Sequence, residues 1–531
     1  MLDTLIKNAC ILDGTGKKAR PGCVGILDGR LVLEGVGALT PAIRTVDAKG
    51  RYLAPGFIDA HSHGDLIFDR EFSMRAKLGQ GITTHIAGQC GESVFPCGKG
   101  FESQYREICG LSNDRIPPEW DGFRTMRAFL DIFEKTPVAL NMGTFVGHNS
   151  IRAAVMGFEN RAPSPEELDR MCALLEEALE NGAMGMSTGL VYMPGCFAKY
   201  PELLALAKVL ARHGAIYVTH MRDEANRVTD AIRETISLGR DSGCRVWISH
   251  HKVSGMKNWG RSSETLRLVD EAIAEGIDVT LDQYPFAASM TGLAACFPPE
   301  RMAVGAGRFI EQLKDPAFRK TVIREMQTEG DYENTFLNAG SFHRIQYSGS
   351  AADPRAEGMR ADDYAALVGK DPFDAMFDLY SVNGGALNSV YYTMNEEDVA
   401  RIFMHPRTVI GTDGITRSET ERTHPRAYGS FPRAINWFVK EKRLLTLEEA
   451  VRKGTGLTAD AFRLKNKGRI AEGLDADLVL FDLDLLSSCA TFDEPDRTCD
   501  GILQVYVGGK PAWENGRMTG EMSGRFIPRP E

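Results

Sequence analysis

The chain has 531 residues, of which 43% are hydrophobic and 25% are charged, and these are the proportions of an ordinary globular protein. Its net charge is −10, with 72 acidic and 62 basic side chains mixed along the sequence. This balance argues against a nucleic acid or an anionic membrane surface as a partner, and no stretch approaches the roughly 20 apolar residues that a membrane-spanning helix needs.

The N-terminal segment, residues 1–16, has too short an apolar run and is too acidic for a signal peptide. The eleven cysteines are an odd number without a repeating framework, which favours reduced thiols in a chain of this size. We therefore predict a cytoplasmic protein.

Both ends of the chain have the pattern of short β-strands joined by turns. Residues 4–12, 22–29, 30–36 and 44–53 form the N-terminal set, and residues 476–484 and 501–517 form the C-terminal set. Because neither set can close a core alone, we predict that residues 1–54 and 466–531 share one small β-sandwich. Two independent β extensions are the alternative.

Between the ends, over residues 55–465, apolar strands alternate with amphipathic helices, which is the pattern of parallel βα units. The predicted strands number eight, as a TIM-type (β/α)8 barrel requires, so the predicted fold class is α/β. These strands are residues 53–63, 82–90, 138–148, 183–190, 215–221, 245–252, 278–286 and 408–414.

The best-marked helix of this region follows Ser164, an N-cap with proline in the first turn and a capping-box glutamate at Glu167, and it ends at Asn181-Gly182. Residues 287 to about 343 break the strand–helix alternation and are too long for a βα loop. We predict that they form an inserted lid or subdomain after the seventh strand.

Polar side chains follow several predicted strands at their carboxyl ends, where barrel active sites form. His61 and His63 are two apart in a strand, so they share a face and can meet one metal ion. Cys90 ends the second strand between glycines, and its alternative role is that of a small buried apolar residue.

His220 ends the fifth strand and His250 ends the sixth. The neighbouring His251 is predicted to point the opposite way and to be either a structural residue or one that supports a metal ligand. Asp413 ends the eighth strand, and a carboxylate beside a metal-activated water is a natural general base. Because burying so many polar groups without a purpose is costly, the set predicts a metal site.

These residues lie in motifs that resemble the amidohydrolase superfamily and, within it, the D-aminoacylase (N-acyl-D-amino-acid deacylase) family. Cys90 at the second strand separates this branch from relatives that typically use a carboxylated lysine. The motifs are LAPGFIDAHSHGDL, GITTHIAGQCGES, FVGHNSIR, GAMGMSTGLVYMPG, THMRDE, ISHHKVSG, LDQYPF, VIGTDG, THPRAYGSFPR and GRIAEGLDADLVLFD.

The resemblance implies zinc-dependent hydrolysis of N-acyl-D-amino acids to a carboxylate and a free D-amino acid. It implies a tight zinc site and a second, weaker or vacant site, with Asp413 as general base and then general acid and with Tyr192 polarising the scissile carbonyl. The implied tight ligands are Cys90, His220 and His250; the implied second-site ligands are His61, His63 and Asp413; and the implied anchors of the substrate carboxylate are Lys252, Tyr284 and Arg426.

Two other functions remain open at this point. One is a related amidohydrolase that acts on cyclic amides or on dipeptides with a D-residue, since its chemistry would be shared. The other is a barrel that has lost catalysis and only binds. The sequence predicts a small-molecule substrate, and it leaves open the preferred D-amino acid, the acyl group, the number of metal ions and the oligomeric state.

Overall fold

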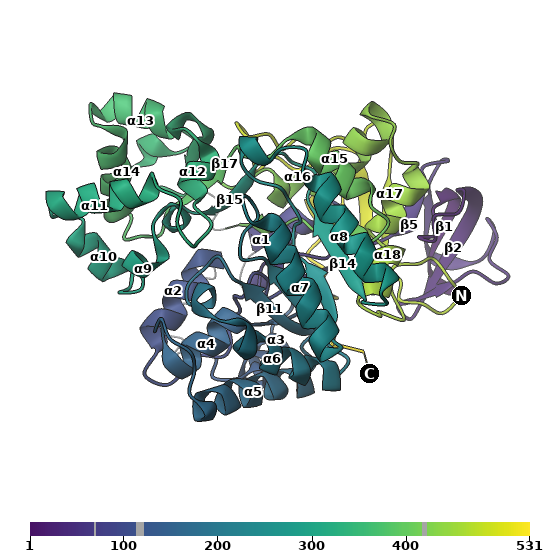
Figure 1. Cartoon of the computed structure of the whole chain (residues 1–531). Helices are drawn as coiled ribbons and strands as arrows, with labels where there is room; N and C mark the ends of the chain where they lie inside the picture. The colour runs from purple at the N-terminus through teal and green to yellow at the C-terminus, as the bar shows by residue number, and fades with distance from the viewer. Residues whose placement is uncertain (68–70, 113–121, 417–421, 531) are drawn as a thin grey trace.

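The computed structural model describes residues 1–67, 71–112, 122–416 and 422–530, and it has an α/β fold (Figure 1). Each of the eight strands predicted for the central region is present. They are β6 (Phe57–Asp59) with β7 (Ser62–His63), β8 (Ile82–Ala87), β9 (Asn141–Thr144) with β10 (Val146–Gly147), β11 (Gly185–Gly189), β12 (Ile216–His220), β13 (Arg245–Ile248), β14 (Val279–Gln283), and β18 (Thr408–Ile410) with β19 (Gly414–Ile415).

The central strands pair in parallel and in the order of the sequence. β6 pairs with β8 and β8 with β9, and the path from β10 through β11, β12, β13 and β14 to β18 forms a six-stranded sheet. β19 then pairs with β7. The eighth strand therefore bonds to the first, and the hydrogen-bonded path returns to its start.

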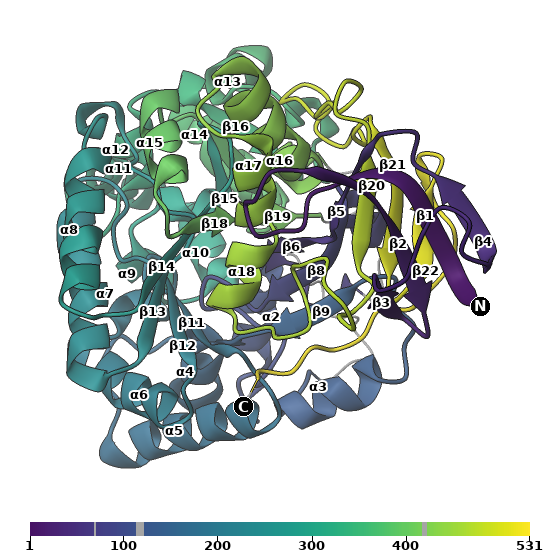
Figure 2. The same cartoon turned by 90° about the vertical axis from the view of Figure 1, so that its right-hand side faces the viewer.

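Helices lie between these strands on the outside of the sheet, and α5, α6, α7 and α8 pack side by side in chain order (Figure 2). The predicted helix is confirmed as α5, with the Ser164–Glu167 capping box formed and Asn181 as C-cap. The helices are α1 (Glu71–Leu78), α2 (Glu102–Ser112), α3 (Met126–Phe133), α4 (His148–Met156), α5 (Pro165–Glu180), α6 (Tyr200–Arg212), α7 (Val228–Ser242), α8 (Ser262–Ala274), α15 (Glu396–Met404), α16 (Arg426–Ala434), α17 (Leu447–Lys453) and α18 (Gly456–Ala461).

The two chain ends share one nine-stranded sheet with its own apolar core. An antiparallel pairing of β5 with β20 joins the N-terminal strands to the C-terminal ones, so the two sets are not independent extensions. The strands are β1 (Leu2–Ile11), β2 (Arg20–Leu27), β3 (Arg30–Val32), β4 (Ala42–Asp47), β5 (Tyr52–Pro55), β20 (Leu478–Phe481), β21 (Ile502–Val507), β22 (Lys510–Glu514) and β23 (Arg517–Met518).

An insert between β14 and β18 forms a lobe beside the rest of the molecule (Figure 1). Its apolar core runs from Leu293 to Tyr391, so the predicted end near residue 343 is wrong. The physical reason is that β17 lies between β15 and β16 and completes their sheet. The elements are β15 (Ser289–Gly292), α9 (Pro299–Met302), α10 (Ala306–Gln312), α11 (Pro316–Met326), α12 (Thr335–Ala339), β16 (Ile345–Ser348), α13 (Ala361–Val368), α14 (Pro372–Val382) and β17 (Asn388–Tyr391).

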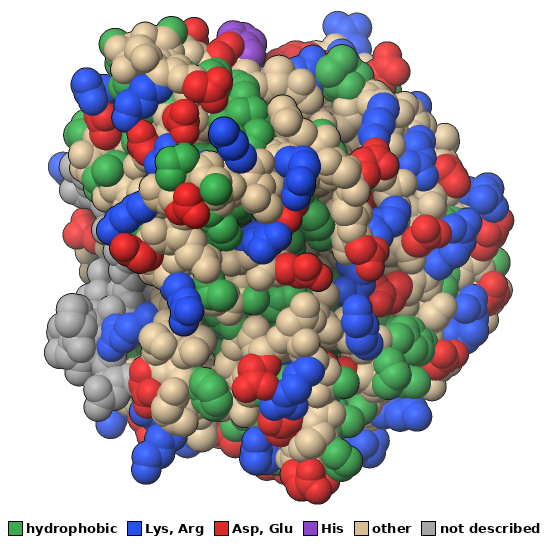
Figure 3. Space-filling model, turned by 60° about the vertical axis from the view of Figure 1, so that its left-hand side comes forward, with side chains coloured by type: hydrophobic (Ala, Val, Ile, Leu, Met, Phe, Trp, Pro, Cys, Tyr) green, Lys and Arg blue, Asp and Glu red, His purple; other side chains and the backbone are tan. Residues whose placement is uncertain are grey.

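The surface in Figure 3 carries acidic and basic side chains interspersed, without a region dominated by one sign. Within the described residues, no helix is long and apolar enough to cross a membrane. The free thiols are those of Cys10, Cys23, Cys90, Cys97, Cys172, Cys196, Cys244, Cys296, Cys489 and Cys499.

A buried ion pair holds the junction between the first and last central strands. Lys77 of α1 donates to Asp59 at 2.6 Å and to the Thr412 hydroxyl at 2.9 Å, while Asp59 also accepts the backbone N–H of Thr412 at 2.8 Å. The two charged side chains are at most 5% exposed. Asp59 lies two residues before His61 and Thr412 directly precedes Asp413, so this network joins the two strand ends that carry these predicted site residues.

We predict that Lys77→Met lowers the free energy of unfolding by about 3 kcal/mol, because removal of one partner leaves a buried charge unpaired. Urea denaturation measures the change. The matched control is Lys257→Met, which breaks an exposed pair with Glu329 and should cost less than about 1 kcal/mol. Equal unfolding midpoints for the two variants would show that the buried pair does not hold this junction.

Candidate metal centre

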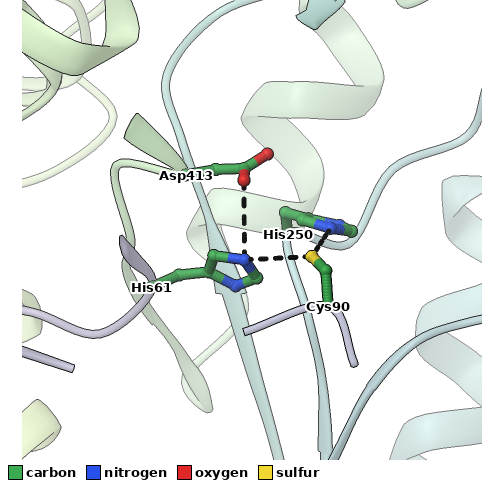
Figure 4. Close-up of side chains that lie close together, drawn as sticks. All are labelled: His61, Cys90, His250 and Asp413. Atoms are coloured by element: carbon green, nitrogen blue, oxygen red, sulfur yellow. Dashed lines mark hydrogen bonds and ion pairs between the residues drawn. The ribbon is translucent and has the colours of Figure 1, made fainter. Parts of the chain in front are cut away.

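Side chains from four separate strand ends converge in one cluster (Figure 4). His61 lies between β6 and β7, Cys90 follows β8, His250 follows β13, and Asp413 lies between β18 and β19. One potential ligand atom of each lies within 4.8 Å of the others, and all four residues are buried. The strand pairing produces this convergence, since all the parallel strands end at the same edge of the sheet.

The distances within the cluster are short. The Cys90 Sγ lies 3.4 Å from Nε2 of His61 and 3.3 Å from Nε2 of His250. Oδ1 of Asp413 lies 3.5 Å from Nε2 of His61 and 3.1 Å from Nε2 of His63. His63 therefore contacts the cluster through Asp413.

Three of these residues have a backbone conformation that is rare outside glycine. The φ angles of Cys90, His250 and Asp413 are 54°, 31° and 48°, and such residues cost on the order of 1–3 kcal/mol each. Each lies two or three residues beyond the end of a strand. Their side chains point toward one another (Figure 4), so local strain at these positions accompanies the convergence.

A second cluster shares His250 with the first and consists of His220, Glu224 and His250. Glu224 contacts Nε2 of His220 at 3.4 Å and Nδ1 of His250 at 3.2 Å, and it accepts a hydrogen bond from Lys252 at 2.7 Å. The sequence analysis did not single out Glu224. Its only signal was its place four residues after His220 in the THMRDE motif.

Asp282 is a second residue that the sequence analysis missed. Its carboxylate lies 3.3 Å from Nδ1 of His61 and accepts hydrogen bonds from the backbone N–H of His250 at 2.9 Å and from the indole of Trp247 at 2.7 Å. Carboxylates that bond the far nitrogen of a ligand histidine fix the ring and its tautomer. Asp282 thus orients His61 and supports the strained backbone of His250.

The protonation states suit metal binding. Burial lowers the pKa of His220 and of His250 well below the ordinary value, so both rings are neutral at pH 7, as a metal ligand must be. Burial and then the negative charge of Asp413 raise the pKa of the Cys90 thiol well above its usual value. A thiolate in this position therefore requires a bound cation.

Asp413 is ion-paired with Arg426, whose Nη1 lies 2.7 Å from Oδ2 of the carboxylate. Burial alone would raise the pKa of Asp413, but the charge of Arg426 and the hydrogen bond from His63 hold that pKa well below its usual range. Asp413 is consequently ionised at neutral pH.

A cavity of about 60 Å³ lies beside the clusters. Three of the remaining predicted residues, Tyr192, Lys252 and Arg426, line it. The Tyr192 hydroxyl lies 2.9 Å from that of Thr291. Tyr284 is described by the structure but is not among the lining residues. It lies behind the cavity, and its ring centre is 4.7 Å from the Arg426 guanidinium and 6.0 Å from the Lys252 ammonium.

His251 points away from the cluster, as strand alternation predicts. Its Nε2 lies 2.9 Å from the hydroxyl of Thr265 on α8, and the side chain is fully buried. This histidine therefore packs a helix against the sheet.

Residues 44–512 match the family described as the amidohydrolase family. The chain belongs to the amidohydrolase family. It is 35% identical to D-aminoacylase of Alcaligenes xylosoxydans xylosoxydans over 527 residues, which covers 99% of this chain and 98% of the relative. It thus spans the whole length of that relative.

Solved structures agree with this assignment. N-acyl-D-glutamate deacylase from Bordetella bronchiseptica, complexed with zinc and a phosphonate mimic of the tetrahedral intermediate, is 33% identical with a TM-score of 0.84 and full coverage of both chains. A D-aminoacylase described as having a binuclear metal centre, with one-metal activation and second-metal attenuation, has the same identity, TM-score and coverage. This amidohydrolase therefore shares its fold with metal-containing deacylases.

The donors of this amidohydrolase fit a zinc ion. Ligand atoms 2.0–2.3 Å from a tetrahedral zinc lie roughly 3.5 Å apart, and the thiol of Cys90 lies 3.3–3.4 Å from two imidazole nitrogens. Thiolate, imidazole and carboxylate are also the ligand types that zinc takes in proteins.

We predict that Asp282→Asn weakens zinc binding by about 10- to 100-fold, because an amide orients His61 less well than a carboxylate does. Titration against a competing chelator measures the affinity. Asp278→Asn is the matched control, since Asp278 lies just before the same strand but pairs with Arg245 and is 40% exposed. Unchanged zinc affinity in Asp282→Asn would contradict the orienting role.

Proposed function

We propose that the chain is a zinc-dependent hydrolase that cleaves the amide bond of N-acyl-D-amino acids to give a carboxylate and a free D-amino acid. The observation that carries the proposal is the buried cluster of Cys90, His61, His250 and Asp413, drawn from four strand ends. Full-length similarity to D-aminoacylase and to N-acyl-D-glutamate deacylase supports the reaction and its substrate class.

We propose that residues 55–465 form a (β/α)8 barrel and that residues 1–54 and 466–531 form a small β-sandwich. The pairing of β19 with β7, which brings the eighth strand back to the first, supports closure of the barrel. The pairing of β5 with β20 supports a shared domain at the chain ends. The insert belongs after the seventh strand, between β14 and β18.

For the metal, we propose Cys90, His220 and His250 as the tight site and His61, His63 and Asp413 as a second, weaker site. In the structure, Cys90 and His250 form one donor group with His61 and Asp413, and His220 and His250 form another with Glu224. The shared His250 places the two groups side by side, which supports two adjacent sites. Its Nδ1 lies 2.7 Å from Nζ of Lys252 and 3.2 Å from Glu224, so both groups contact the ring nitrogen opposite the Nε2 that faces Cys90. When bound, zinc polarises the scissile carbonyl and lowers the pKa of the attacking water.

Asp413 is the proposed general base. It takes a proton from the attacking water and then delivers this proton to the leaving nitrogen as the C–N bond breaks. Its ion pair with Arg426 supports the role, because the pair keeps the carboxylate ionised.

Tyr192 is the proposed donor to the carbonyl oxygen as negative charge develops there. Burial raises the pKa of its hydroxyl well above the ordinary value, so the proton needed for this hydrogen bond stays on Tyr192.

Lys252 and Arg426 are the proposed anchors of the substrate α-carboxylate. An arginine fork binds a carboxylate with two parallel hydrogen bonds and a lysine adds a point charge. Tyr284 supports both cations from behind the cavity through the face of its ring, so its contribution to carboxylate binding is indirect. When the substrate carboxylate and the scissile carbonyl are both held in place, the R group can point to only one side of the pocket. This constraint selects one enantiomer.

We predict that Asp413→Asn lowers kcat by about 10³-fold, because the amide accepts no proton, while the tight-site zinc remains bound. Steady-state kinetics and metal analysis of the same preparation measure the two effects. Asp331→Asn, which changes an exposed carboxylate, should match the parent. A nearly active Asp413→Asn enzyme would refute the base assignment.

We further predict that the zinc-loaded chain hydrolyses N-acetyl-D-methionine at least about 100-fold faster than the L form, and that a chelator abolishes the activity. Chiral chromatography of the products measures both. Faster cleavage of a hydantoin or of a dipeptide with a D-residue would favour the related amidohydrolase activities instead. A chain that binds no zinc and hydrolyses none of these compounds would be the non-catalytic binding barrel.

A further inference from the structure

We propose that a second, apolar cavity next to the metal cavity receives a straight hydrocarbon portion of the substrate, either its acyl chain or its side chain. The inference rests on the proposed function, since the substrate must place its amide at the metal centre. It adds a binding site to that function and predicts a preference for long apolar groups.

The two cavities are adjacent and share a wall. Val191, Tyr192, Thr291, Ala295 and Glu333 line both of them. Tyr192 is the proposed donor to the scissile carbonyl and lines both cavities. A hydrocarbon chain that extends from the reacting group past Tyr192 is therefore directed toward the second cavity.

The second cavity is much larger than the first, at about 340 Å³ against about 60 Å³ on the same measure. Protein interiors have few voids larger than a water molecule, and cavities of about 150 Å³ already hold benzene. An acetyl group would leave most of this space empty. Its size therefore indicates a guest longer than the smallest acyl group.

The wall of the cavity is chiefly apolar. It is formed by three segments of the insert, within residues 291–306, 332–333 and 380–388, together with α2, Phe158 and residues 191–193. The main apolar side chains are Phe158, Met193, Phe297, Met302, Tyr380 and Leu387. Because apolar cavities do not retain ordered water, transfer of hydrocarbon from water into this space is favourable.

The charged residues of the wall do not favour an acidic guest. Glu107 and Glu333 are two carboxyls, and Arg106 is the one cation that lines the cavity among the described residues. Burial raises the pKa of Glu107, which is the response of a carboxyl in apolar surroundings. A substrate carboxylate at this place would face two acidic groups, so D-aspartate and D-glutamate side chains do not suit it.

The test is a chain-length series on the zinc-loaded enzyme with two arms. One arm lengthens the acyl group of N-acyl-D-alanine from acetyl to butyryl, hexanoyl and octanoyl. The other lengthens the side chain of N-acetyl-D-amino acids from alanine to norvaline, norleucine and 2-aminooctanoic acid. We expect kcat/KM to rise about threefold per methylene in one arm, and that arm identifies which end of the substrate enters the cavity.

Two further results bear on the proposal. Ala294 lines the second cavity but not the first, so Ala294→Phe should remove most of the gain with chain length. The matched control, Ala366→Phe, changes an exposed alanine of α13 in the same insert and should keep the parent's gain. A flat series in both arms, or N-acetyl-D-glutamate as the best substrate, would overturn the proposal.

Failure of the proposed function would be recognised separately. If the zinc-loaded chain hydrolyses none of these amides, calorimetry with the uncleaved acyl series still measures affinity against length. Affinity that rises with each methylene in the parent and not in Ala294→Phe would support the cavity as a hydrocarbon site. Affinity independent of length would overturn it.

Discussion

The central constraint on this structure is that a thiol, several imidazoles and a carboxylate are buried together at one edge of a parallel sheet. Cys90 lies within 3.4 Å of two imidazoles, and Asp413 reaches His61 and His63. Buried polar groups cost free energy unless they are hydrogen-bonded or bound to a metal. A cation satisfies the thiolate, the neutral imidazoles and the carboxylate at once, so this set of donors fits a bound metal ion.

Two supporting networks keep the cluster in place. Lys77, Asp59 and Thr412 tie the eighth strand to the first, and Asp282 ties His61 to the backbone of His250. Both networks are buried, where an unpaired charge is expensive and a satisfied one is rigid. The positive φ angles of Cys90, His250 and Asp413 persist because the buried contacts around them leave the backbone no alternative conformation of lower free energy.

Sequence reasoning predicted the strands and their polar ends because both follow from local periodicity. The same reasoning missed Glu224, Asp282 and Glu333, whose importance arises from contacts between distant segments: Glu333 of the insert, for example, accepts the backbone N–H of Glu224 at 2.6 Å. The end of the insert was misplaced for a similar reason. The sequence analysis assigned no strand to the residues of β16 and β17, and only their pairing with β15 assigns them to the insert.

The metal donors and the wall of the second cavity belong to different parts of the chain, so the reaction and the substrate selectivity can vary separately. The metal donors come from strand ends whose positions are set by the sheet, so a change in any of them disturbs the whole cluster. The second cavity is walled largely by the insert, whose apolar core is separate from that of the central region. Substitutions there alter the shape offered to the substrate without moving a strand end. Substrate preference is therefore expected to depend on residues of the insert, while the chemistry depends on the sheet.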